Sequence, residues 1–120
     1  MKAVFDTNIL VDYLLGNLSS SEEIQQYKNP SISIITKMEI LVGASEDTEE
    51  VIREFLDNFT IISLNDEIAE IAIIIRKEHK IKLPDAIIWA SAKYSNSLLV
   101  TRNTKDFPAH SADIKIPYNI

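Results

Sequence analysis

Three acidic residues lie where apolar segments begin or end. They are Asp6 in "KAVFDTN", Glu39 in "TKMEILVG" and Asp85 in "LPDAIIWA". Carboxylates that converge can hold a hard divalent cation, because Mg²⁺ and Mn²⁺ prefer oxygen ligands. The chain has no cysteine and only two histidines, so thiolate sites are excluded and a histidine-based metal site is not expected. Any metal bound by this chain is therefore expected to be held by oxygen.

Each acid also has a purely structural interpretation. Glu39 lies three residues after Thr36, which is the spacing of a capping box. Asp85 would lie in the first turn of a helix, where the helix dipole stabilises an acid by roughly 0.3–1 kcal/mol. Asp6 could cap the helix that follows it, and Asp106 in "TKDFP" could be an ordinary turn residue. Together, however, these interpretations require separate segments to place acids on one edge of one sheet, and this conjunction favours a site.

The apolar pattern predicts strands that alternate with helices. Short β-branched and apolar runs predict strands over 2–5, 31–35, 60–64, 97–101 and 113–117. Helical spacing predicts helices over 7–16, from 19–21 to 27, and over 36–43, 47–58, 66–79 and 84–96. This order predicts an α/β fold, a three-layer sandwich whose mainly parallel central sheet of four to five strands is flanked by helices. Ligands of such sheets bind outside the carboxyl ends of the strands.

Length and composition narrow the possibilities further. The 120 residues, 46% of them hydrophobic, are expected to form a single domain over 1–120. No apolar run approaches the roughly 20 residues of a membrane span, so the prediction is a cytoplasmic protein without a membrane partner. The net charge of −6 argues against binding nucleic acid through bulk charge and favours a basic partner or a cation.

Two other classes of α/β protein fit less well. A nucleotide- or phosphate-binding α/β module would need a glycine-rich loop to hold the phosphate. The chain has only two glycines and no such loop. A phosphoaspartyl enzyme or receiver domain would use the carboxylate after the first strand, but "FDTN" lacks a second acid two residues later. That class is therefore a remote alternative.

The segments "FDTNILVDYLLG", "ITKMEILVG" and "LPDAIIWASAKYSNSLLVTRNTKDF" resemble successive motifs of the PIN domain. In size and pattern the chain is similar to the VapC-type toxin ribonucleases of toxin–antitoxin pairs. The resemblance implies an endoribonuclease that depends on Mg²⁺ or Mn²⁺. It implies that Asp6, Glu39 and Asp85 are catalytic, and Asp6 and Asp85 are expected to be direct metal ligands.

One position departs from the family pattern. The fourth family acid, where present, falls on Asn103 in this sequence, and an aspartate follows three residues later at Asp106. Asp106 could substitute for that acid or could only fix the turn, so both are interpreted as supporting positions. Thr7, Asn8 and Thr101 are further supporting residues, expected to hold the acids by hydrogen bonds or to follow ordinary turn and cap chemistry.

Basic residues near the acids are predicted to guide RNA, namely Arg102, Lys105 and Lys37. The basic run 76–82 could belong to the same rim, although basic residues in the last turn of a helix also complement its dipole.

The resemblance also implies three partners: an RNA substrate, a second copy in a homodimer, and a small antitoxin lying across the acidic groove. Apolar residues of 36–42 and 47–59 could supply the protein interface, although packing in the core explains them equally well. The alternative function, suggested by Asn103, is a non-catalytic PIN-like module that only binds RNA or protein.

Overall fold

The computed structural model describes residues 1–119. Its centre is a five-stranded sheet in the order β3-β2-β1-β4-β5, in which every pair of neighbouring strands is parallel. The strands are β1 (Ala3–Phe5), β2 (Ser31–Ser33), β3 (Thr60–Ile62), β4 (Leu98–Val100) and β5 (Ile114–Lys115). The helices are α1 (Thr7–Leu14), α2 (Leu18–Gln25), α3 (Ile34–Val42), α4 (Glu49–Leu56), α5 (Asp66–His79) and α6 (Leu83–Tyr94).

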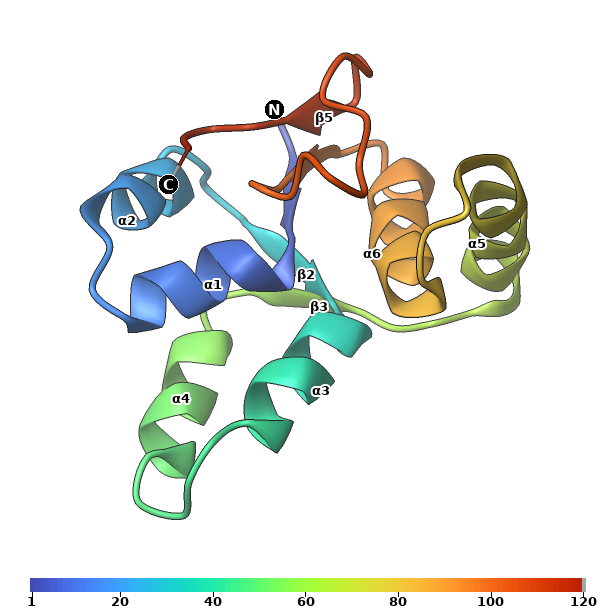
Figure 1. Cartoon of the computed structure of the whole chain (residues 1–120). Coiled ribbons are helices and arrows are strands. Elements are labelled where there is room, and N and C mark those ends of the chain that lie inside the picture. Colours follow the sequence, from blue (N-terminus) through green and yellow to red (C-terminus); the bar gives the residue numbers. More distant parts are fainter. Residues whose placement is uncertain (120) are drawn as a thin grey trace.

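Helices cover both faces of the sheet, as Figure 1 shows for α5 and α6 on one side and α1, α3 and α4 on the other. Successive side chains of a strand point to opposite faces. Val4 of β1 accordingly joins the core under α5 and α6, which also contains Trp89. Phe5 joins the second core under α1, α3 and α4. The predicted three-layer α/β fold with a parallel sheet is confirmed.

Several helix starts differ from the prediction. Residues 34 and 35, predicted to end a strand, already belong to α3, because the Ser33 hydroxyl accepts a hydrogen bond from the Ile35 amide at 3.1 Å and caps the helix. Thr36 therefore lies inside the helix and is buried. The capping-box interpretation of Thr36 and Glu39 is consequently wrong.

The remaining differences are smaller. Helix α2 is capped by Asn17 and not by a serine at 19–21, since the Asn17 side chain accepts from the Ser20 amide at 2.9 Å. Asn65 caps α5, which begins at Asp66 as predicted, with 2.8 Å from the Asn65 side-chain oxygen to the Ile68 amide. Strands β3 and β5 are shorter than predicted. Among residues 1–119, no helix combines the length and apolar character needed to cross a membrane.

Candidate active site

Asp6 is held rigidly at the carboxyl end of β1. Its side chain is 4% exposed and makes three hydrogen bonds. Oδ1 accepts from the Thr7 amide at 2.8 Å, so the carboxylate caps α1. Oδ2 accepts from the Thr101 hydroxyl at 2.8 Å and from the Asn8 amide group at 3.0 Å. The Asp6 carboxylate thus caps α1 and also lies at the edge of the sheet where the site is expected.

Glu39 lies on α3 and is linked to the same edge through Thr7. The Thr7 hydroxyl donates to Glu39 Oε1 at 2.7 Å, and the Thr36 hydroxyl lies 3.0 Å from the Thr7 hydroxyl. Thr7 therefore contacts two acids, Asp6 through its backbone and Glu39 through its side chain. The sequence predicted Thr36 only as a possible helix cap and not as a contact of the site, because its link to Thr7 joins residues 29 positions apart.

Asp85 and Asp106 complete the group of acids. Asp85 is half-buried in the first turn of α6, and Pro84 occupies the turn with it. Asp106 lies in the turn after β4, where the Asn103 amide group donates to Asp106 Oδ2 at 3.0 Å. Asn103 Oδ1 also accepts from the backbone amides of Lys105 and Asp106, at 3.2 and 3.1 Å. Asn103 thus holds Asp106 through its side chain.

The four acids act on one another electrostatically. Burial, aided by the charges of Asp85 and Glu39, raises the pKa of Asp6 to about 6 against the hydrogen bonds from Thr101 and Thr7, which lower it. Burial also raises the pKa of Asp85, as do the nearby charges of Asp106 and Glu39. Four separate segments therefore place mutually repelling carboxylates at one edge of the sheet.

The donor set fits a hard cation. Every candidate ligand is a carboxylate oxygen, and the three hydrogen bonds to Asp6 leave one of its roughly four acceptor positions open. Among residues 1–119, no group of three or more His, Cys, Asp or Glu side chains is arranged closely enough to hold a metal ion. Mg²⁺ commonly takes only one or two carboxylates and completes its shell with water and substrate phosphate. The set is therefore compatible with an ion held by a pair of these acids.

The three predicted RNA-binding residues lie in different surroundings. Lys105 is exposed in the turn beside Asp106. Lys37 lines a hollow between α3 and α4 together with Arg53. Arg102 is paired with Asp12 of α1, with 2.6 Å from Nε to Oδ2 and 3.1 Å from Nη2 to Oδ1. The structure does not bring the three together.

Asp12 was not among the predicted site residues. It is 5% exposed and also accepts a hydrogen bond from the Tyr118 hydroxyl at 2.8 Å. Burial raises its pKa, but the hydrogen bonds from Arg102 and Tyr118 outweigh burial and leave the pKa below the ordinary value. The available signal was an acid inside the apolar helix "NILVDYLL", which requires a buried partner.

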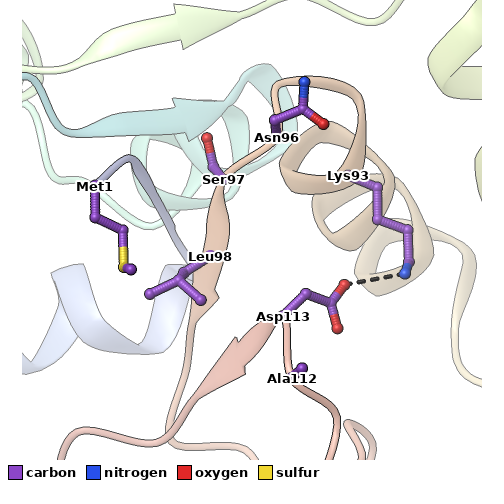
Figure 2. A pocket seen from close by; sticks show the side chains of 7 residues that line it. All are labelled: Met1, Lys93, Asn96, Ser97, Leu98, Ala112 and Asp113. Atoms are coloured by element: carbon purple, nitrogen blue, oxygen red, sulfur yellow. Dashed lines mark ion pairs between the residues drawn. The ribbon is translucent and has the colours of Figure 1, made fainter.

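A different hollow, of about 460 Å³, lies at the amino ends of β1 and β4, away from the acids. Figure 2 shows its lining and the ion pair between Lys93 and Asp113, whose Nζ–Oδ2 distance is 3.0 Å. Trp89 Nε1 also donates to Asp113 at 2.9 Å. These contacts tie α6 to the segment before β5, so the ion pair has a structural explanation. Trp89 is 2% exposed and belongs to the core.

Comparison with known proteins identifies relatives of this arrangement. The PIN domain profile matches residues 3–112. No curated protein sequence gives a significant match. A chain of the solved toxin–antitoxin complex from Klebsiella pneumoniae is 42% identical with a TM-score of 0.93, and the match covers 98% of this chain and 99% of that chain.

Two more distant structures share the fold. A chain of VapBC-1 from nontypeable Haemophilus influenzae is 25% identical with a TM-score of 0.73, covering 89% of this chain and 90% of that chain. A chain of FitAcB from Neisseria gonorrhoeae is 23% identical with a TM-score of 0.81, covering 98% and 99%. Because the family profile spans most of the sequence and the fold agrees, the chain belongs to the PIN domain family.

Proposed function

We propose that this protein is a metal-dependent endoribonuclease, the toxin of a toxin–antitoxin pair that acts in the cytoplasm. The observation that carries the proposal is the group of four acids at the carboxyl edge of the sheet, with the pKa of Asp6 raised to about 6. An arrangement that stores repulsion between carboxylates favours the binding of a cation. The likeness to a chain of a toxin–antitoxin complex supports the biological role.

Each acid has a distinct task in this proposal. Asp6 and Asp85 bind Mg²⁺ or Mn²⁺, Asp6 because it is fixed by three hydrogen bonds and Asp85 because no hydrogen bond within residues 1–119 occupies its carboxylate. Glu39 orients the attacking water through Oε2, since Oε1 already accepts from Thr7. Asp106 supplies the fourth negative charge. When bound, the cation supplies a polarised water and positive charge that stabilises the phosphorane-like transition state.

The same edge offers surfaces for the proposed protein partners. A cavity of about 510 Å³ is lined by Ile35, Met38, Glu39, Val42 and Pro84. Met38 is 55% exposed and Val42 is 86% exposed, and both line this one hollow together with Ile35 and Pro84. An antitoxin segment, or a second copy in a homodimer, would cover such residues. An antitoxin that also places a basic side chain among the acids would match the net charge of −6.

The deciding experiment is induced expression of the wild type and Asp6→Asn in parallel, with growth curves and sequencing of new RNA 5′ ends. We expect the wild type to slow growth and create new ends, and Asp6→Asn to do neither. Asp57→Asn, which changes an exposed acid at the end of α4, is the matched control and should behave as the wild type.

Purified protein tests the metal and the alternative function together. Cleavage of a mixed RNA pool should require Mg²⁺ or Mn²⁺ and stop in EDTA. Equal growth and identical RNA profiles for wild type and Asp6→Asn would overturn the toxin proposal. RNA binding without cleavage in either metal would instead establish the non-catalytic binding module.

A further inference from the structure

Arg102 and Asp12 form a bidentate ion pair between the exit of β4 and the middle of α1. The two nitrogen–oxygen distances are 2.6 and 3.1 Å, and the Arg102 side chain is 34% exposed against 6% for Asp12. The Tyr118 hydroxyl donates to Asp12 Oδ2 at 2.8 Å, the oxygen that also accepts from Arg102 Nε. Three segments far apart in the sequence therefore meet at one buried carboxylate.

Adjacent residues of the β4 exit bind two different carboxylates of the α1 segment. Thr101 is fully buried and donates to Asp6, while Arg102 extends to Asp12. The Arg102 backbone amide donates to Asn8 Oδ1 at 3.3 Å, and the Asn103 amide donates to Thr101 Oγ1 at 3.0 Å. The segment that carries Thr101 and Asp106 is thus attached to α1 at two places, at the start of the helix and at Asp12.

We propose that Arg102 and Asp12 are positioning residues for the acidic site and that Arg102 is not an RNA contact. The ion pair holds segment 101–106 against α1, and this fixes Thr101 and Asp106 relative to Asp6. The inference rests on the proposed ribonuclease function for its kinetic consequence, but the geometric consequence can be tested without it.

The charge balance of the pair supports this assignment. Two of the three guanidinium nitrogens of Arg102 bind Asp12, so the pair as a whole is close to neutral and attracts a polyanion weakly. A buried ion pair adds little net stability compared with apolar side chains, but it holds its partners in one geometry. Such a device is useful where a displacement of about 1 Å can lower a rate by about a hundredfold.

The kinetic test compares Arg102→Met, Asp12→Asn and the double variant. We expect kcat for RNA cleavage to fall about 10- to 100-fold in each single variant, with the double variant no worse than the more damaged single one. KM and the salt dependence of RNA binding should stay within about twofold of wild type, because no phosphate contact is lost. Arg53→Met removes an exposed arginine paired with Glu49 on α4 and should leave both parameters unchanged.

The second readout is hydrogen exchange in the metal-free protein. The amides of Asn103 and Asp106 donate to Thr101 Oγ1 and Asn103 Oδ1, so they report on the segment directly. Their exchange should accelerate about tenfold or more in Arg102→Met and Asp12→Asn, while Ile75 in the core of α5 stays protected. Tyr118→Phe is the fallback variant if Asp12→Asn does not fold. It removes one hydrogen bond to Asp12 and keeps the ion pair, so it should accelerate the exchange of the same amides by a smaller factor.

Two results would overturn the proposal. One is unchanged exchange at Asn103 and Asp106 in the Arg102→Met variant. The other is a raised KM with a smaller salt dependence in Arg102→Met but not in Asp12→Asn, which would make Arg102 an RNA contact. If the wild type cleaves no RNA at all, the ribonuclease proposal fails while the exchange measurements still decide the role of the ion pair.

Discussion

The Asn103 side-chain amide donates a hydrogen bond to the Asp106 carboxylate, with 3.0 Å between Nδ2 and Oδ2. Asn103 also accepts from the Asp106 backbone amide at 3.1 Å, so the two residues close a small turn. The turn presents Asp106 near enough to Asp85 for its charge to raise the pKa of Asp85. The Asn103 side chain thus holds the charge of Asp106 near Asp85.

This relationship predicts that Asn103 and Asp106 act as a unit. Asp106→Asn should lower kcat by about tenfold because it removes a charge near the cation, and Asn103→Ala should lower kcat similarly because it releases Asp106. Single-turnover cleavage assays would measure both. Thr104→Ala alters an exposed residue of the same turn and serves as the control. Full activity of Asn103→Ala would show that the turn holds Asp106 without its help.

Asp85→Asn is expected to stabilise the metal-free protein while abolishing cleavage. The pKa of Asp85 is raised by burial and by Asp106 and Glu39, so its ionised form is disfavoured in the folded state. We expect the melting temperature in EDTA to rise by about 2–4 °C, measured by circular dichroism. Asp66→Asn removes an acid from the first turn of α5 and should lower the melting temperature slightly, because only a helix dipole interaction is lost. A fall of several degrees for Asp85→Asn would identify Asp85 as a helix-stabilising residue.

The stability of the metal-free protein should depend on pH through Asp6. Its folded pKa of about 6 lies above the ordinary value of 3.8, so folding favours the protonated form. The stabilising contribution is complete below about pH 4 and is lost as pH rises through 6. The free energy of unfolding should thus be about 1 kcal/mol higher at pH 5 than at pH 7, by urea titration in EDTA.

The direction of this pH effect separates Asp6 from the ion-paired acids. Asp12 and Asp113 have lowered pKa values. The stability that they contribute is therefore lost only as the pH falls below 3.8, the ordinary pKa of an aspartate. Saturating Mg²⁺ should abolish or reverse the difference between pH 5 and pH 7, because the cation binds the ionised carboxylates. A free energy of unfolding that increases from pH 5 to pH 7 in EDTA would contradict the burial of an ionisable Asp6.

Thr7→Val is predicted to impair catalysis with little change in fold. The variant keeps the backbone amide of residue 7, which donates to Asp6 Oδ1 at the start of α1. It loses the hydroxyl that donates to Glu39 at 2.7 Å. We expect kcat to fall about tenfold while the affinity for RNA is unchanged, since Glu39 loses its orientation. Thr60→Val changes an exposed threonine at the start of β3 and is the control. Wild-type kcat in Thr7→Val would show that Glu39 needs no such support.

The architecture and the main acids were predictable from the sequence. The alternation of apolar strand runs with helical spacing predicted a parallel α/β sandwich, because burial on both faces of a sheet imposes that pattern on the chain. Acids at the boundaries of such elements fall on one edge, so the sequence predicted a site with Asp6, Glu39 and Asp85, with Asp106 as a supporting position. Helix boundaries were less predictable, since Ser33 and Asn17 cap helices that other polar residues nearby could also have begun.

The partners of the polar side chains were decided only by the tertiary structure. Sequence patterns report local periodicity, whereas Arg102 and Asp12 are 90 residues apart and Thr7 and Glu39 are 32 residues apart. A charged side chain chooses between solvent, RNA and a buried counterion according to what the fold places within about 3 Å of it. The sequence alone thus identified the acids and the sheet edge that gathers them. Folding determined that Arg102 turns to a buried aspartate and that an asparagine holds the fourth acid.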